Sequence, residues 1–146
     1  MAVLPSLADI ESPRLRHAIF WTGAAFCAAG AAVVYHWNPE GAGFFPACPL
    51  RTYTGYYCPG CGATRALHQL LHGHIGAALG YNPLFVLSVP FVAYWIISEV
   101  FLLLGGRALP RIPAPDKLMW LVLAIVITFG VARNIPYYPL TLLAPH

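Results

Sequence analysis

Long apolar stretches separated by short polar ones dominate this chain. Three of them, 18–37, 83–104 and 118–135, approach or exceed the roughly 18 to 20 apolar residues that cross the hydrocarbon of a bilayer. They predict three transmembrane helices. No stretch alternates polar and apolar residues as a half-buried strand does. The expected fold class is therefore all-α, a single polytopic membrane domain over residues 1–146.

The composition agrees with a membrane protein. Hydrophobic residues make up 59% of the 146 residues and charged residues only 9%, and the mean hydropathy is +0.67. A soluble domain would have too little polar surface. The bilayer is thus the first expected partner. No nucleic-acid partner is expected.

The first stretch leaves two alternatives open. Arg14 and Arg16 precede it as a charged region precedes the apolar core of a secretory signal peptide, but the run is long and lacks a clear cleavage site. We therefore interpret it as an uncleaved span. It is also rich in Gly and Ala, which permits close helix contact within the chain, with another membrane protein or through self-association.

The basic residues suggest an orientation. If the chain crosses the membrane three times, the segment before the first helix and the segment between the second and third helices lie on the same side. These segments contain five of the eight Lys and Arg residues: Arg14, Arg16, Arg107, Arg111 and Lys117. The positive-inside rule places them in the cytoplasm. The N-terminus is then cytoplasmic, and the loop 38–82 lies outside.

That outer loop contains a short amphipathic helix over residues 62–72. Its polar stripe occupies about 60° of the helical wheel, opposite alanines and leucines. The stripe contains Cys61, Arg65, His68 and His72. Such a helix fits the membrane interface, where one face remains wet. Asn82 and Pro83 follow as a predicted N-cap and first-turn proline of the second span.

Three of the four cysteines flank the start of this helix, as Cys48 and the CPGC sequence from Cys58 to Cys61. A zinc site is one interpretation, because the CxxC spacing suits zinc and His68 would complete a Cys₃His set. Thiol–disulfide exchange is a second, because free N–H groups at a helix start and the charge of Arg65 stabilise a thiolate. A structural disulfide from Cys48 to Cys58 or Cys61 is the third.

The arginines and histidines also have two interpretations. In the first, they form the solvated polar face that a helix at the membrane interface needs. If the outer loop folds over the stripe, Arg65, His68 and His72 instead form a cationic or metal-coordinating pocket, completed by Arg133 at the end of the third span. Such a pocket suits a phosphate or carboxylate, such as a lipid headgroup. Asn134 directly follows Arg133 and belongs to the same candidate set.

Several of these positions together resemble a known family. The pattern consists of Cys48-Pro49, Thr54-Gly55, CPGCGATR from Cys58 to Arg65, Leu71-His72-Gly73, Ala77, Asn82-Pro83-Leu84 and a closing Arg133-Asn134. It resembles the signature of the bacterial membrane family catalogued as domain of unknown function 2752. The resemblance implies a small inner-membrane protein of a few helices. It also implies one constellation of Cys48, Cys58, Cys61, Arg65, Asn82, Arg133 and Asn134.

We therefore expect a multi-pass protein of the bacterial inner membrane with a Cys, Arg and His cluster on its outer face. The cluster acts as a structural disulfide or metal clip in an accessory or binding protein, with zinc as the candidate ion. The alternative is a membrane thiol–disulfide oxidoreductase or metal-handling protein that uses Cys58 and Cys61. An enzyme is the less favoured class, because no catalytic carboxylate or serine arrangement is recognisable.

Overall fold

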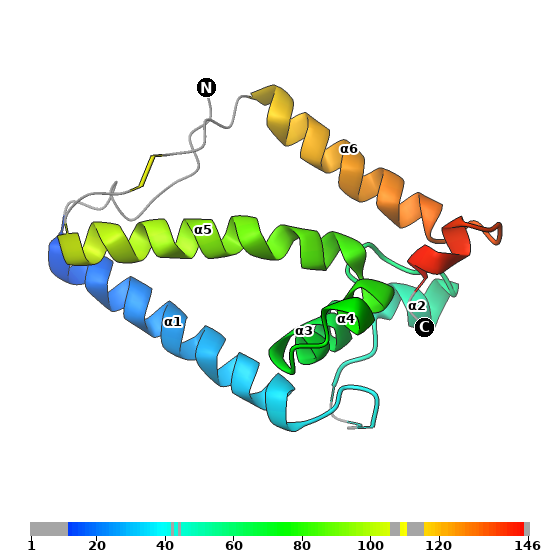
Figure 1. Ribbon diagram of the computed structural model, residues 1–146, viewed down its shortest axis with the longest axis horizontal. Coiled ribbons are helices and arrows are strands. Elements are labelled where there is room, and N and C mark those ends of the chain that lie inside the picture. The colour runs from blue at the N-terminus through cyan, green and yellow to red at the C-terminus, as the bar shows by residue number, and fades with distance from the viewer. Residues whose placement is uncertain (1–11, 42, 44, 106–108, 111–115, 145–146) are drawn as a thin grey trace.

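A computed structural model of the chain describes residues 12–41, 43, 45–105, 109–110 and 116–144. Within these residues it contains helices and no strand, which confirms the predicted all-α class. Figure 1 shows three long helices, α1 (Pro13–His36), α5 (Pro83–Gly105) and α6 (Asp116–Ala132). The shorter elements are α2 (Pro49–Thr54), α3 (Ala63–Leu71), α4 (Ile75–Tyr81) and a 3₁₀ helix (Leu140–Leu143).

The boundary between α4 and α5 is set by the predicted Asn-Pro pair. Pro83 occupies the first position of α5, where a missing N–H breaks no helical hydrogen bond. The Oδ1 atom of Asn82 accepts the backbone N–H of Phe85 at 3.0 Å, which satisfies one of the unpaired donors of the first turn. The expected cap is therefore confirmed.

The short helix after the CPGC sequence is also present, as α3. It ends in a Schellman motif, in which the N–H of His74 bonds to the carbonyl of Gln69 at 2.8 Å and that of Gly73 to Leu70 at 3.0 Å. Gly73 takes the left-handed φ of +79° that this motif requires. By contrast, α2 lies inside a loop that had no predicted helix.

In Figure 1 one end of each long helix lies near the short helices, and the opposite ends of α1 and α5 come together in that view while α6 leads away from both. α3 packs against α4, and both contact α5, while α3 also contacts the end of α1. Few side chains in the described residues are buried, and the buried apolar ones are small or isolated: Val34, Cys61, Ala66, Ala78 and Leu102. The short helices therefore form the packed part of the fold.

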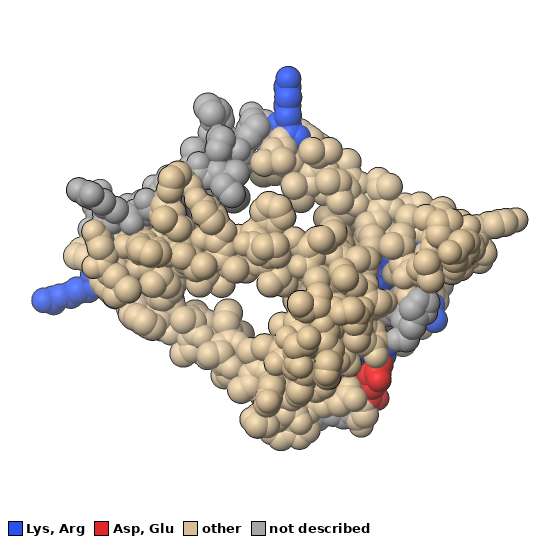
Figure 2. Space-filling view, in the orientation of Figure 1, with Lys and Arg blue, Asp and Glu red and all other residues tan. Residues whose placement is uncertain are grey.

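The long helices carry large apolar side chains on their surfaces. Phe26 is 82% exposed, Leu104 79% and Trp120 72%, and a soluble monomer rarely exposes so much contiguous apolar surface. By length and composition α1 and α5 can each cross a membrane. The third predicted span is not confirmed, because α6 has only 17 residues. On the face shown in Figure 2, the charged side chains lie along the outline of the molecule rather than in its middle.

Candidate metal centre

The three clustered cysteines meet where α2 and α3 begin. Cys48 directly precedes α2, and the CPGC loop (residues 58–61) directly precedes Gly62 and α3. The Sγ atom of Cys58 lies 3.4 Å from that of Cys48 and 3.3 Å from that of Cys61. All three Sγ atoms lie within 4.8 Å of one another. We refer to these three residues as the thiol cluster.

The CPGC loop is a tight turn that directs its sulfurs inward. The backbone N–H of Cys61 donates to the carbonyl of Cys58 at 3.1 Å, which closes the turn. The N–H of Cys58 in turn donates to the Sγ of Cys61 at 3.3 Å. Gly62 follows with a left-handed φ of +84°, so the chain can change direction into α3.

The predicted structural disulfide is not supported. Every cysteine of the chain is a free thiol in the structure. The shortest Sγ–Sγ distance in the thiol cluster, 3.3 Å, is well beyond the roughly 2.05 Å of a sulfur–sulfur bond. The three sulfurs share one centre rather than forming one bonded pair and a spare thiol. Sequence could not decide this, because both arrangements use the same spacing.

The thiols of the cluster have unlike acidities. The backbone N–H of Arg51, and then the thiol of Cys58, stabilise the thiolate of Cys48 and lower its pKa to about 7. Burial, and then the neighbouring thiol of Cys58, raise the pKa of Cys61 to about 12. Cys48 therefore ionises first, while Cys61 stays protonated unless a cation takes the place of its proton.

Asn82 holds the CPGC loop from the start of α5. Its Nδ2 atom donates to the carbonyl of Pro59 at 2.9 Å and to that of Cys61 at 3.2 Å. The same side chain caps α5 through Oδ1, and only 1% of it is exposed. One amide thus fixes the loop and the helix together. Local pattern had suggested only the cap, and the family resemblance had grouped Asn82 with the cysteines.

Arg133 holds the same loop from the end of α6. Its Nη1 atom donates to the carbonyl of Cys58 at 3.0 Å and to that of Pro59 at 3.3 Å. The guanidinium also faces the rings of Phe129, with its carbon 4.9 Å from the centroid, and Tyr57, at 5.7 Å. It is 2% exposed. Within the described chain, Arg133 serves as a support for the backbone of the CPGC loop.

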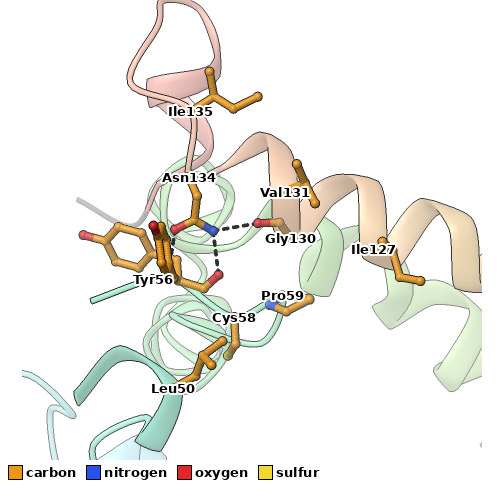
Figure 3. A pocket seen from close by; sticks show the side chains of 10 residues that line it. Leu50, Tyr56, Cys58, Pro59, Ile127, Gly130, Val131, Asn134 and Ile135 are labelled. Carbon is orange, nitrogen blue, oxygen red and sulfur yellow. Dashed lines mark hydrogen bonds between the residues drawn. The ribbon is translucent and has the colours of Figure 1, made fainter. Parts of the chain in front are cut away.

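Asn134 adds a third support beside it. Its Oδ1 accepts the backbone N–H of Tyr57 at 2.8 Å, and its Nδ2 donates to the carbonyl of Tyr57 at 2.9 Å and to that of Gly130 at 2.7 Å. Figure 3 shows this amide between α6 and the loop that carries Cys58. It pairs with both backbone groups of one residue, as a neighbouring strand would.

Gly130 lets α6 approach the loop closely. A Cβ atom at this position would lie 2.9 Å from Cγ of Pro59, closer than side-chain carbons are found. The residue is unremarkable in the sequence, since nothing local marks it. Only the contact across 71 residues shows why a side chain would not fit.

An open apolar groove of about 460 Å³ borders Cys58. Figure 3 shows its walls, with the loop on one side and α6 on the other. The wall residues of α6 include Ile127 and Val131, and those of the loop include Tyr56 and Pro59. One face of the thiol cluster is therefore next to a space that a small ligand could enter.

The other sequence candidates lie elsewhere. His68, proposed as a fourth metal ligand, is not in the thiol cluster, and its Nδ1 lies 2.6 Å from the carbonyl of Val34. Arg65 faces Glu40 with a nitrogen–oxygen distance of 3.8 Å. His72 stacks on Tyr35. The structure thus brings Asn82, Arg133 and Asn134 to the cysteines but does not gather Arg65, His72 and Arg133 into one anion pocket.

Comparison with known proteins adds one match. Residues 48–96 match the family described as "Protein of unknown function (DUF2752)". The match contains the thiol cluster, α2, α3, α4 and α5 as far as Ile96. It confirms the resemblance found in the sequence. No curated protein and no solved structure matches the chain.

Proposed function

We propose, from the match of residues 48–96 to the DUF2752 family and from the site described above, that the chain is a metal-binding membrane protein. Its thiol cluster would hold one thiophilic divalent ion, zinc before others, in an accessory or binding protein rather than an enzyme. The observation that carries this proposal is the convergence of three Sγ atoms within 4.8 Å of one another.

The distances fit the ion. Zinc holds thiolate sulfur at about 2.3 Å in a tetrahedron, so its sulfurs lie about 3.8 Å apart. The separations of 3.3 and 3.4 Å, and the 4.8 Å limit on the whole cluster, bracket that value. Small side-chain rotations suffice to adjust them. Three thiolates also suit zinc better than calcium or magnesium, which prefer oxygen.

The surrounding side chains favour binding by holding the loop in place. Asn82 and Arg133 together occupy the carbonyls of Cys58, Pro59 and Cys61. The loop backbone is therefore fixed before an ion arrives, which lowers the ordering cost of binding. Such supports typically change metal affinity by roughly 10- to 100-fold when they are removed.

The site leaves one position for an outside ligand. In the described part of the chain no fourth His, Cys, Asp or Glu joins the three thiols. Sites with three protein ligands keep a position open for water or another donor, whereas structural zinc sites are closed by four. The open groove beside Cys58 offers access to that position. The proposed ion is accordingly exchangeable.

We place this site at the outer surface of a bacterial inner membrane. α1, α5 and α6 would be the three spans, with α6 short and therefore little tilted. The ends of α1 and α6 that face away from the thiol cluster carry Arg14, Arg16 and Lys117, and the positive-inside rule favours the cytoplasm for them. The short helices would lie at the opposite interface.

Elemental analysis of the detergent-purified protein by mass spectrometry tests the metal site. The expected result is about one zinc per chain, lost in Cys58→Ser and Cys61→Ser. Cys27→Ser is the matched control, because Cys27 lies in α1 outside the thiol cluster. No metal after incubation with zinc, together with three freely titrating thiols, would reject the proposal.

Thiol–disulfide exchange is a second candidate, favoured by the lowered pKa of Cys48 and its 3.4 Å distance from Cys58. The Cys48 thiolate would attack a partner disulfide and release one partner thiol. Cys58 would then resolve the mixed disulfide, leaving an oxidised Cys48–Cys58 pair and a second partner thiol. A reduction potential in the range of thiol oxidoreductases, with no bound metal, would favour this candidate.

A further inference from the structure

A second group of possible metal ligands lies on the polar stripe of α3, away from the thiol cluster. His68 and His72 are one helical turn apart, and their ring centroids are 4.4 Å apart. His68 is half-buried and His72 is exposed. The pair lies seven and eleven residues beyond Cys61, so at 1.5 Å per residue His68 begins about 10 Å from the thiol cluster.

The hydrogen bonds fix which ring nitrogen carries the proton. Nδ1 of His68 lies 2.6 Å from the carbonyl oxygen of Val34, and Nδ1 of His72 lies 2.8 Å from that of His68. A carbonyl oxygen can only accept, so each Nδ1 must donate an N–H. In the neutral rings the lone pair is then on Nε2. Across the described ranges of the chain, neither Nε2 has a hydrogen-bond partner.

Both rings are also held in position. The Val34 carbonyl belongs to the last turn of α1, where carbonyls lack a helical partner, and His68 supplies one. Tyr35 stacks on the ring of His72 with centroids 4.4 Å apart and planes 4° apart. Metal-binding histidines almost always donate their other ring N–H to a carbonyl or carboxylate in this way.

From this arrangement we infer that His68 and His72 bind a divalent transition-metal ion through their Nε2 atoms. Histidines four residues apart on one helix face can bind a single ion, as in the two-histidine motif of zinc proteases. Imidazole suits nickel, copper and zinc, and among divalent ions the order of affinity favours copper and nickel over manganese and iron. Water would fill the remaining positions.

The neighbouring charged groups leave the pair free for this role. Glu40, the closest described carboxylate along the stripe, faces Arg65 at 3.8 Å and accepts the hydroxyl of Tyr81 at 3.0 Å. His74 is a further imidazole in this region, with its ring centroid 6.5 Å from that of His72. The site uses nitrogen ligands and does not rest on the thiol cluster, so either site can exist without the other.

Histidine footprinting on the unaltered full-length protein in detergent tests this site. Diethyl pyrocarbonate modifies free imidazole nitrogens, and peptide mass spectrometry locates the modified residues. With Ni²⁺ as the probe, we expect modification of His68 and His72 to slow at least fivefold, while His17, in the first turns of α1, is unaffected. Because each histidine is measured separately, an ion on the thiol cluster cannot imitate the result. Unchanged modification of both residues at saturating Ni²⁺ would overturn the inference.

Substitutions of the two histidines provide a second test. His72→Ala should raise the Ni²⁺ concentration that half-protects His68 at least tenfold. His17→Ala should leave that concentration unchanged. His68→Ala also removes the partner of the Val34 carbonyl, so its helical content is compared with the unaltered protein by circular dichroism. Full protection of His68 in the His72→Ala variant would show that the two rings do not share an ion, and would overturn the inference.

Discussion

At the scale of single residues, the three sulfurs of the thiol cluster differ because their surroundings differ. Cys48 is half-exposed and faces backbone N–H groups, while Cys61 is buried and faces the other thiols. The same side chain thus has a pKa of about 7 at one position and about 12 at the other. An ion that binds here must displace protons, so binding strengthens as the pH rises.

The difference predicts selective alkylation in metal-free protein. Alkylation needs the thiolate, so its rate at Cys48 should rise with pH and level off above about 7, where the thiolate is the main form. At pH 8 Cys48 is therefore mainly thiolate, whereas Cys61 is almost entirely protonated. Iodoacetamide labelling at several pH values, read by peptide mass spectrometry, measures both rates. Earlier labelling of Cys61 than of Cys48 would contradict the assigned environments.

At the scale of elements, the CPGC loop joins α4 and α5 to α6 through three side chains. Asn82 connects it to α4 and α5, and Arg133 and Asn134 connect it to α6. Asn82 is the one of these side chains that reaches the carbonyl of Cys61, and Asn134 is the one that reaches the carbonyl of Tyr57, so removal of either donor leaves that carbonyl without this bond. Such a loss costs about 1–3 kcal/mol for each group.

Two substitutions at Asn82 test its two roles, which are capping α5 and holding the CPGC loop. Asn82→Asp keeps the oxygen that caps α5 but loses the donor to Pro59 and Cys61, while Asn82→Ala loses both. We expect roughly 10- to 100-fold weaker zinc binding in both variants. Both should also lose thermal stability, the alanine variant because the cap is lost and the aspartate variant because a buried carboxyl then faces two carbonyl oxygens. Competition with a zinc chelator and thermal unfolding in detergent measure the two effects. Unchanged zinc affinity in both would show that the loop needs no such support.

Gly130 gives a test of the approach of α6 to the loop. Gly130→Ala places a carbon 2.9 Å from Pro59, so we expect overpacking to lower the free energy of unfolding by about 1–3 kcal/mol. Gly23→Ala in α1 is the matched control, since nothing lies within 4 Å of its new Cβ. There the better helix propensity of alanine should be neutral or stabilising. Equal effects of the two changes on denaturant unfolding would argue against the close contact.

At the scale of the whole molecule, local pattern predicted the helices and left their arrangement open. The apolar runs, the Asn-Pro cap and the stripe after CPGC were readable because each depends on neighbours within a few turns. The position of His68 against α1 and the fit of Gly130 against Pro59 depend on contacts between distant segments. Resemblance to a family grouped Arg133 and Asn134 with the cysteines, which spacing alone did not do.

The proposed orientation is also a whole-molecule property. If the thiol cluster faces outward, a maleimide that cannot cross membranes should label Cys48 in intact, reduced cells. A Cys27-only variant should stay unlabelled until the cells are permeabilised, because Cys27 lies in the middle of α1. Labelling of Cys48 only after permeabilisation would reverse the orientation.

The bonds between Asn134 and Tyr57 cross 77 residues of sequence, and the bond from Arg133 to Cys58 crosses 75. They attach α6 to the loop without using the chain that joins α5 to α6. A backbone break between residues 105 and 116 should therefore leave two pieces that still recognise each other. Two separately produced fragments, 1–105 and 116–146, are expected to recombine in one membrane, with the second supplying the guanidinium and amide that the first lacks.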